Sequence, residues 1–301
     1  MGEAAETGEG RRKPIVALVL ASGGLKPFSA LPLIEFLDRE GIDVDLLVGA
    51  SGGGIVAALR AMGRTCGEIR ELANEVGRKR VFRKDWRSLL SILNLPGGRF
   101  DRRSGLFKPD AVMDMCRECY GERRIEELPK KLILQATDFE TGQGVALEQG
   151  SLADAVYASM AIHPFLPPIE IGGRWLFDGC FSAPVPIMPA VTHPADVILV
   201  LEVLENLKIP DSGFQSFMIH TNKITAQTIL RNQAALSVML HHYEIVFVKV
   251  RFEKYLHIWD FKEMPYIFEA GEAATNKYGG EILNAIGSYR PEEERRPADS
   301  P

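Results

Sequence analysis

The stretch VDLLVGASGGGIVAALRAM, residues 44–62, carries the first information about the fold of this 301-residue chain. It opens with a stretch from Val44 to Val48 that is apolar apart from Asp45, crosses a glycine-rich turn, and continues from Ile55 to Met62 with mostly small and apolar residues. A short, mainly apolar stretch of this kind is typical of a strand that is covered on both faces. The stretch therefore predicts a buried strand, a tight turn and a helix.

The turn fits the pattern G-x-S-x-G, with Gly49, Ser51 and Gly53 at its fixed positions. A strand before it and a helix after it are the context in which this pattern forms a nucleophile elbow. The serine hydroxyl is then held at the carboxyl edge of the sheet, where the free N–H groups of the helix stabilise negative charge. Gly49 and Gly53 let the strand and the helix pack closely. The alternatives are a simple tight turn and a phosphate-binding turn, which the missing Gly-Lys-Ser/Thr disfavours.

Outward from this unit, strands and helices alternate along the chain. Further strands are predicted at 15–20, 132–136, 175–177 and 197–203, and the alternating pattern at 244–250 predicts another. Helical patterns fall at 30–37, 152–160, 217–240 and 266–286. Such alternation implies a mostly parallel sheet between helices. We therefore predict an α/β fold with three layers, α/β/α, around a mostly parallel central sheet.

The composition is that of an ordinary globular chain, with 46% apolar and 25% charged residues. We expect one domain over residues 14–289, between a disordered leader at 1–13 and a disordered tail at 290–301, because both ends are poor in apolar residues. The net charge of −5 gives no sign of nucleic-acid binding, which usually comes with a basic excess. Without a signal peptide or an apolar run of about 20 residues, we predict a cytoplasmic protein that meets membranes only peripherally.

A second glycine-rich turn follows the first predicted strand and reads Ser22-Gly23-Gly24-Leu25-Lys26-Pro27. Acyl transfer passes through a tetrahedral oxyanion, which needs N–H donors aimed at it. Gly23 and Gly24 are the candidates for these donors, and Lys26 adds positive charge. A plain structural turn is the alternative, whereas a dinucleotide-type turn fails because G-x-G-x-x-G is absent.

A nucleophilic serine also needs a base. None of the six histidines has a sequence context that singles it out; they are His163, His193, His220, His241, His242 and His257. Asp178-Gly179 follows the short predicted strand at 175–177, so its carboxylate can reach the same sheet edge as Ser51. Taken alone, Asp-Gly is more often only a turn. The single C-x-x-C pair, Cys116 and Cys119, is a weak metal signal, and we interpret the cysteines as free thiols.

Together, these residues resemble the patatin-like phospholipase family. The glycine-rich turn at 22–27 stands where the family shows G-G-G-x-R-G, and the elbow at 49–53 and the pair Asp178-Gly179 follow in the family's order. Softer matches are Thr137-Asp138-Phe139-Glu140-Thr141-Gly142 and the run from Ala158 to Pro168. The resemblance is clear from Ile15 to Val203 and looser beyond.

The resemblance implies a patatin-like fold and a Ser51–Asp178 dyad that works without histidine. Ser51 would attack an ester carbonyl of an acyl lipid, and Asp178 would take its proton and later activate water. It implies no metal and no organic cofactor. Three departures affect the oxyanion turn: Ser22 and Pro27 replace glycines, and Lys26 replaces arginine. Cys180 also stands where a second glycine is frequent.

A basic segment from Arg78 to Arg87 interrupts this acidic chain and contains Phe82 and Trp86. With the leucines that follow, it suits an anionic membrane surface, which would make it a peripheral membrane contact. As an insertion, it could also be a lid over an acyl pocket. The reading that we prefer from sequence is a solvated helical face whose apolar side packs on the core.

Three functions compete with a lipid acyl hydrolase. A catalytically impaired lipid-binding or regulatory protein is supported by Ser22 and Pro27. Acyl transfer from a carrier thioester normally needs a histidine base and a carboxylate-binding arginine, neither of which can be placed. A histidine-dependent Ser-His-Asp hydrolase predicts that one His→Ala change abolishes activity while Asp178→Asn is mild.

Overall fold

The computed structural model describes most of the chain. The described residues are 13–78, 81–92, 95, 101–205, 217, 220–221, 224–225, 227–229, 244–254, 256–257 and 260–289. The expected tail, nearly all of the expected leader, and most of the helix predicted at 217–240 lie outside these described residues, as do His241 and His242.

An eight-stranded sheet forms the centre of the molecule, in the order β5-β6-β3-β2-β1-β7-β8, with β4 pairing to β3. Its strands are β1 (Val16–Leu20), β2 (Leu46–Ala50), β3 (Lys131–Asp138), β4 (Gly144–Leu147), β5 (Ile169–Ile171), β6 (Arg174–Asp178), β7 (Val197–Glu205) and β8 (Glu244–Phe252). The five strands β3, β2, β1, β7 and β8 run parallel, while β4, β5 and β6 join antiparallel. The prediction of a mostly parallel sheet is confirmed. The antiparallel edge was mostly missed because β4 and β5 have only four and three residues, too few for a clear apolar pattern.

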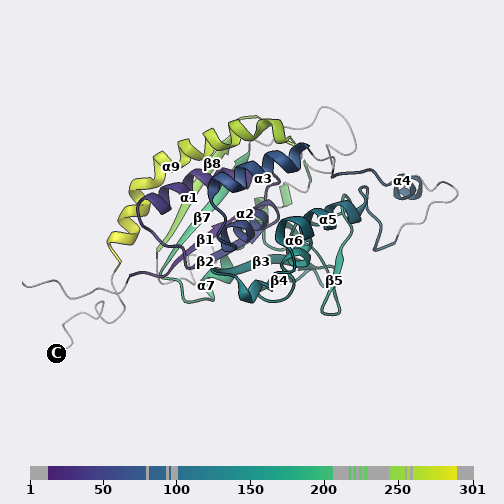
Figure 1. The fold of residues 1–301 in the computed structure, drawn as a ribbon, viewed down its shortest axis with the longest axis horizontal. Helices are drawn as coiled ribbons and strands as arrows, with labels where there is room; N and C mark the ends of the chain where they lie inside the picture. The colour runs from purple at the N-terminus through teal and green to yellow at the C-terminus, as the bar shows by residue number, and fades with distance from the viewer. Residues whose placement is uncertain are drawn as a thin grey trace, which may run out of the picture.

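Helices surround the sheet (Figure 1). They are α1 (Ala30–Arg39), α2 (Gly52–Ala61), α3 (Cys66–Arg78), α4 (Trp86–Ile92), α5 (Pro109–Tyr120), α6 (Leu152–Met160), α7 (Ile187–Val191) and α9 (Met264–Gly287), with short 3-10 helices η1 (Lys26–Ser29), η2 (Ile125–Glu127), η3 (Gly179–Phe181) and η4 (Phe261–Glu263). The predicted helices at 30–37, 55–62, 152–160 and 266–286 are confirmed to within three residues at each end. Sequence reasoning missed α3 and α5, whose charged residues outweigh their narrow apolar faces.

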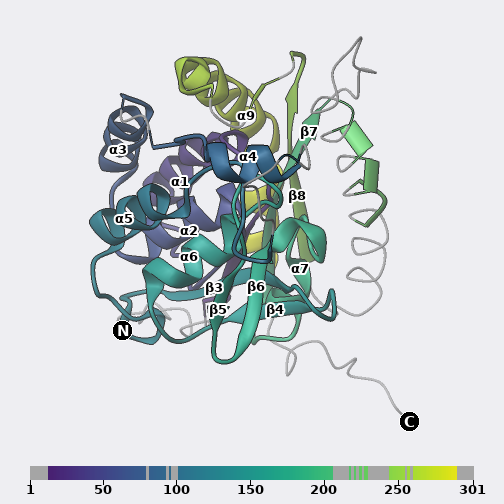
Figure 2. The same ribbon diagram turned by 90° about the vertical axis from the view of Figure 1, so that its right-hand side faces the viewer.

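The two faces of the sheet are covered by different layers. Leu18 and Leu20 of β1 pack into the larger core with α1, α2 and α6, while Ala17 and Val19 pack into a smaller core with α7. Figure 2 shows α7 across the sheet from α1, α2 and α6. Since successive side chains of a strand point to opposite faces, a strand covered on both sides has to be apolar throughout. This explains the continuous apolar runs from which the central strands were predicted.

Helix α9 packs against η1, which directly follows the glycine-rich turn at 22–25. The contact requires a glycine, because a Cβ at Gly271 would lie 2.2 Å from the carbonyl oxygen of Ser29. Gly280 in the same helix has nothing within 4 Å of the position of a Cβ. The two glycines therefore differ only in what surrounds them.

We expect Gly271→Ala to lower the free energy of unfolding by about 1–3 kcal/mol, because the methyl group overlaps the backbone of η1. The matched variant Gly280→Ala should raise it by up to about 1 kcal/mol, since alanine is the better helix former. Chemical denaturation of both variants measures the difference. Equal effects of the two changes would show that α9 does not approach η1 as closely as described.

Candidate active site

Ser51 lies between the end of β2 and the start of α2, in a strained backbone conformation. Its φ of 53° makes it the one non-glycine residue with positive φ in the described part of the chain. Its N–H donates to the carbonyl oxygen of Ser159 at 3.1 Å and to the Ser159 hydroxyl at 3.0 Å. The Ser159 hydroxyl in turn donates to the carbonyl of Gln135 at 2.7 Å. These bonds hold the strained turn against β3 and α6.

Glycines around Ser51 are required by close backbone contacts. A Cβ at Gly53 would lie 2.4 Å from the carbonyl oxygens of Leu20 and Ala21, and one at Gly49 would lie 2.6 Å from that of Gly53. At Gly52 the distance to the carbonyl oxygen of Gly24 would be 1.8 Å. The elbow and the glycine-rich turn after β1 are therefore in backbone contact.

The register of the sheet brings Asp178 level with Ser51. Ala50 pairs with Gln135 of β3, and the next residue of β3, Ala136, pairs with Asp178 at the end of β6. Ser51 Oγ donates a hydrogen bond of 2.8 Å to Asp178 Oδ2, across 127 positions of sequence. β6 runs antiparallel to β3 and pairs only with the last three residues of β3, so β6 ends while it is still level with the carboxyl end of β2.

The Asp178 carboxyl is fully buried. Its second oxygen, Oδ1, accepts a hydrogen bond of 2.8 Å from the N–H of Cys180, and its backbone carbonyl accepts one of 2.8 Å from the Thr137 hydroxyl. Burial raises the pKa of Asp178 to about 6, although the hydrogen bonds from Cys180 and Ser51 act to lower it. This carboxylate is thus a stronger base than an ordinary aspartate, and it is still ionised at neutral pH.

Free N–H groups gather in the turn at 22–25. The N–H of Ser22 donates to the carbonyl of Pro184 at 2.7 Å, and that of Lys26 donates to Gly23 at 3.2 Å. The N–H groups of Gly23, Gly24 and Gly52 have no acceptor among the described residues. All three glycines line the same cavity as Ser51, as does the buried side chain of Lys26.

Pro27 does not disturb this turn, in contrast to what its replacement of a glycine suggested. It lies in the first turn of η1, where a missing N–H leaves no hydrogen bond unmade. Its side chain does not belong to the cavity lining. The departure at Pro27 is thus accommodated by the helix that begins there.

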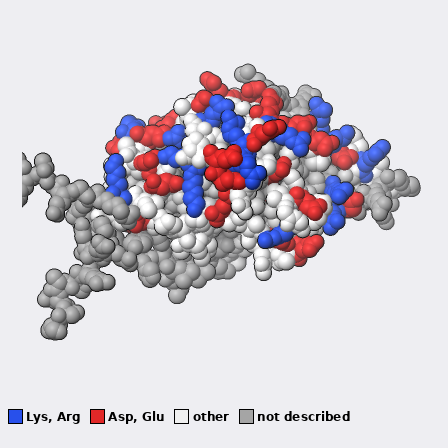
Figure 3. All heavy atoms as spheres, turned by 60° about the horizontal axis from the view of Figure 1, so that its bottom comes forward, with Lys and Arg blue, Asp and Glu red and all other residues white. Residues whose placement is uncertain are grey.

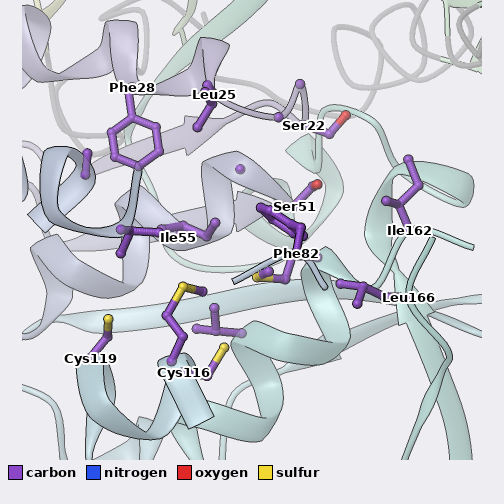
Figure 4. Close-up of a pocket in the computed structure, with 18 of the residues that line it drawn as sticks. Ser22, Leu25, Phe28, Ser51, Ile55, Phe82, Cys116, Cys119, Ile162 and Leu166 are labelled. Atoms are coloured by element: carbon purple, nitrogen blue, oxygen red, sulfur yellow. The ribbon is translucent and has the colours of Figure 1, made fainter. Parts of the chain in front are cut away.

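The cavity beside Ser51 has a volume of about 260 Å³ and is lined almost entirely by apolar side chains (Figure 4). Ser51, Ile55 and Leu59 line it from one face of α2, at intervals of four residues. Since an α-helix rises 1.5 Å per residue, the lining extends about 12 Å from the serine along α2. The remaining walls come mainly from α3, α5 and α6, through Leu72, Ala73, Val76, Met115, Cys116, Cys119, Tyr120, Val156 and Met160.

Comparison with known proteins identifies the family of the chain. The model of the patatin-like phospholipases matches residues 18–191, which contain both glycine-rich turns and Asp178. The chain belongs to this family.

The relatives of this patatin-like chain are larger proteins. An uncharacterised NTE family protein of Mycobacterium tuberculosis is 29% identical over 194 residues, which are 64% of this chain and 50% of that protein. Lysophospholipase NTE1 of Kluyveromyces lactis is 24% identical over 301 residues, which are 90% of this chain and 19% of that protein. The chain thus spans half the length, or less, of these curated relatives.

Solved structures also align with the patatin-like chain. VipD from Legionella pneumophila aligns with a TM-score of 0.48 and 12% identity, over 90% of this chain and 67% of that chain. ExoU, in its complex with SpcU from Pseudomonas aeruginosa, aligns with a TM-score of 0.46 and 17% identity, over 92% of this chain and 53% of that chain.

The described histidines of this patatin-like protein include His163, whose ring centroid lies 5.9 Å from that of Phe139. No described histidine hydrogen bonds to Ser51 or Asp178. The ring of His193 instead contacts Glu148 at 3.3 Å and the carbonyl of Pro189 at 2.6 Å, in a different cavity. The histidine-dependent alternative therefore has no support from the described residues.

Three cysteines line the patatin-like cavity as free thiols: Cys116, Cys119 and Cys180. Burial raises the pKa of Cys116 to about 12, and the pKa of Cys180 lies well above its usual value for the same reason. Neutral thiols behave as small apolar groups. Within the described residues, no group of three His, Cys, Asp or Glu side chains is arranged to hold a metal ion.

Sequence reasoning missed Ser159, Thr137 and Gly52. Ser159 and Thr137 lie in stretches that already resembled the patatin-like family, but neither residue type has a pattern that announces a buried hydrogen bond. Gly52 was passed over because G-x-S-x-G leaves that position free. Only the contact with the carbonyl of Gly24 explains the requirement.

The basic segment does not form the helical face that we preferred from sequence. Residues 81–85 are not helical, Lys84 forms a β-bridge with Phe107, and α4 begins only at Trp86. Trp86 is 69% exposed, so it does not pack on the core. Residues 79 and 80 lie outside the described part of the chain. The expected helix was wrong because backbone hydrogen bonds and an isolated β-bridge to residues 106–108 keep residues 83–85 extended. The expected packing on the core is confirmed for Val81 and Phe82.

We expect Asp178→Asn to stabilise the fold at pH 8. The folded pKa of about 6 lies above the ordinary aspartate value of 3.8, so this carboxyl favours folding below pH 3.8 and loses that contribution as the pH rises through 6. A shift of about two units corresponds to about 3 kcal/mol. The asparagine should therefore raise the free energy of unfolding by about 1–3 kcal/mol at pH 8 and by much less at pH 4, as urea denaturation at the two pH values would measure.

Asp138→Asn is the matched control with the opposite sign. Hydrogen bonds from the backbone of Thr141 and Glu140 lower the pKa of Asp138. The Asp138 carboxylate therefore stabilises the folded state at pH 8, and this stabilisation is lost on acidification. Asp138→Asn should lower the free energy of unfolding at pH 8. If Asp178→Asn changed the free energy of unfolding equally at pH 8 and at pH 4, the burial of a charged carboxylate would not be the cause of the change.

Proposed function

We propose that the protein is a serine-dependent lipid acyl hydrolase of the phospholipase or lysophospholipase type. The observation that carries this proposal is the hydrogen bond of 2.8 Å from Ser51 Oγ to Asp178 Oδ2 beside a cavity of apolar side chains. Membership of the patatin-like phospholipase family supports hydrolysis of a lipid ester. The dyad and the steps below are our own assignment.

In the first step, Ser51 Oγ attacks the ester carbonyl, and the Ser51 proton passes to Asp178. A base with a pKa of about 6 is poised for this work near neutral pH. Asp178 then gives the proton to the oxygen of the departing alcohol, which leaves the acyl group on Ser51 as an ester. The hydrogen bond from the N–H of Cys180 holds the carboxylate in place throughout.

The negative charge on the carbonyl oxygen would be stabilised by backbone N–H groups. We assign this oxyanion hole to Gly23 and Gly24, with the N–H of Gly52 at the start of α2 as a third donor, because their N–H groups have no described acceptor. Lys26 would add positive charge from the wall of the cavity. Donors that are fixed before the reaction need no reorganisation as the charge develops.

In the second step, Asp178 removes a proton from water, which attacks the acyl group on Ser51. The tetrahedral intermediate collapses, Ser51 recovers its proton, and the fatty acid leaves. The same residues thus serve both halves of the reaction, which releases an alcohol and then an acid.

The substrate that best fits the cavity is a lipid ester that inserts one acyl chain along α2. The apolar face formed by Ile55 and Leu59 leads away from Ser51, so the chain would lie on the helix with its carbonyl at the serine. The relatives from Debaryomyces hansenii and Kluyveromyces lactis are named lysophospholipase NTE1, and a lysophospholipid carries a single acyl chain. We further propose a cytoplasmic location with peripheral membrane contact in the region of Arg78 to Arg87. No described helix has the length and hydrophobicity that a membrane span requires.

A catalytically impaired lipid-binding or regulatory protein is the second candidate. Its support is Ser22, whose N–H donates to Pro184 and so is not available to an oxyanion. It predicts binding of fatty acids or lysolipids without turnover. Measurable ester hydrolysis that depends on Ser51 would exclude it.

We expect Ser51→Ala and Asp178→Asn each to lower kcat/KM for p-nitrophenyl butyrate by at least about 1000-fold, since both act on the reacting atoms. The six single His→Ala variants serve as controls and should keep the activity within about threefold. Circular dichroism checks that every variant is folded. A folded Asp178→Asn protein with near-normal activity, or one inactive histidine variant, would replace the dyad by a histidine-dependent mechanism.

We expect Leu59→Phe to shorten the acyl chain that the enzyme accepts, because the ring would fill the part of the cavity two turns of α2 away from Ser51. Each pair of methylene groups of the substrate that no longer fits in the cavity should lower kcat/KM about tenfold. Esters of decanoate and acetate would be compared, with Leu59→Met as the control of similar volume. An equal loss on both esters would mean that the chain does not follow α2.

A further inference from the structure

One insertion stands out from the body of the molecule. We call residues 81–108 the α4 insertion, of which 81–92, 95 and 101–108 are described. Its two ends are tied together by backbone hydrogen bonds of 2.8 Å, from Asp85 to Leu106 and from Lys108 to Arg83. Figure 1 shows α4 at the right-hand end, away from the sheet and the other helices.

The base of the α4 insertion is part of the cavity. Phe82 and Phe107 lie next to each other with ring centroids 5.6 Å apart, and Phe107 stacks on Phe165 at 6.0 Å. All three rings line the cavity beside Ser51. The insertion is therefore fixed to the wall of the proposed acyl site, so whatever α4 binds is held at a set position relative to that cavity.

The outer part of the insertion exposes apolar side chains. Trp86 is 69% exposed, Leu90 40% and Leu95 44%. Trp86 and Leu90 are four residues apart and share one face of α4. Only seven large apolar side chains are exposed in the described part of the chain, and three of them lie between residues 86 and 95. Such a concentration marks a binding surface.

Basic residues flank these apolar side chains in the sequence. Arg83, Lys84 and Arg87 are exposed, and so are Arg102 and Arg103, whose guanidinium groups lie over the ring of Trp175 at 4.4 and 5.6 Å. The insertion has two acidic residues, and each accepts a hydrogen bond from a backbone N–H of the insertion. Asp85 accepts from the N–H of Arg87, and Asp101 accepts from the N–H of Arg103. Basic and acidic side chains are both visible at the right-hand end in Figure 3, the end at which Figure 1 places α4. Within the described part of the insertion, six basic residues stand against these two acidic ones. This is a local positive surface on a chain of net charge −5.

We propose that the α4 insertion docks on an anionic lipid bilayer, with Trp86 and Leu90 entering the interface and Arg83, Lys84 and Arg87 facing the headgroups. An exposed tryptophan and leucines flanked by basic residues are the chemistry that binds such an interface. A protein partner would need acidic groups around an apolar pocket, whereas the bilayer offers both features everywhere.

Docking would serve the proposed hydrolase by orienting its cavity toward the bilayer, and this consequence rests on the proposed function. Phe82 and Phe107 join the docked insertion to the cavity lining. An acyl chain could then pass from the bilayer along apolar side chains to α2. The contact is thus centred on α4, and not on the whole basic run from Arg78 to Arg87.

The test compares vesicle binding with hydrolysis of a water-soluble ester by the full chain. The double variant Trp86→Ala/Leu90→Ala should lower the partition coefficient on vesicles of phosphatidylcholine and phosphatidylglycerol at least tenfold in a flotation assay. Hydrolysis of p-nitrophenyl acetate should stay within about twofold. Leu283→Ala, an exposed leucine in α9, is the matched control and should bind like the wild type.

The role of charge is tested separately with the double variant Lys84→Glu/Arg87→Glu. This variant should bind the anionic vesicles at least tenfold more weakly than the wild type. It should also lose most of the preference of the wild type for anionic vesicles over vesicles of pure phosphatidylcholine. The proposal is overturned if the Trp86/Leu90 variant binds like the wild type, or if the wild type binds no vesicles while it hydrolyses the soluble ester. Vesicle binding that depends on Trp86 and Leu90 in a protein without esterase activity would support docking and refute the proposed function.

Discussion

The backbone contact between two glycine turns is the constraint on which the site depends. The carbonyl of Gly24, after β1, lies so close to Gly52, after β2, that no side chain fits between them. Glycine within a helix destabilises it by about 1 kcal/mol, yet α2 begins with three glycines. What these glycines allow is a close contact of the two turns, in which Ser51 and the glycines with free N–H groups line one cavity.

Asp178 shows how the fold sustains an unfavourable group. A buried carboxylate destabilises the native state, and here the hydrogen bonds directed at its oxygens come from Ser51 and from Cys180. The surrounding sheet holds it in place, because β6 pairs with β3 on one side and the Thr137 hydroxyl binds the Asp178 carbonyl. The penalty of burial is also what raises its pKa toward the range that suits a base.

The cavity and the α4 insertion divide the recognition of a lipid between two kinds of surface. The cavity is apolar and lined mainly by side chains of core helices, so it matches an acyl chain and does little to select a headgroup. The insertion is apolar at its outer face and has flanking basic residues, so it matches an interface more than a single molecule. Phe82 and Phe107 belong to both, which makes the base of the insertion the link between surface and site.

The sequence by itself determined the elements whose signal is local. A strand buried on both faces must be apolar throughout, so β1, β2 and β7 could be predicted from short windows, and the glycines of both turns marked the carboxyl edge of the sheet. Asp178-Gly179 was a weak signal alone and gained weight only from the family resemblance. The tertiary structure decided what depends on register and distant pairing: the level of Asp178 beside Ser51, the need for Gly52, the hydroxyl of Ser159 and the accommodation of Pro27 in η1. The basic segment was misread for the same reason, because its extended form depends on residues 106–108, which no local pattern connects to it.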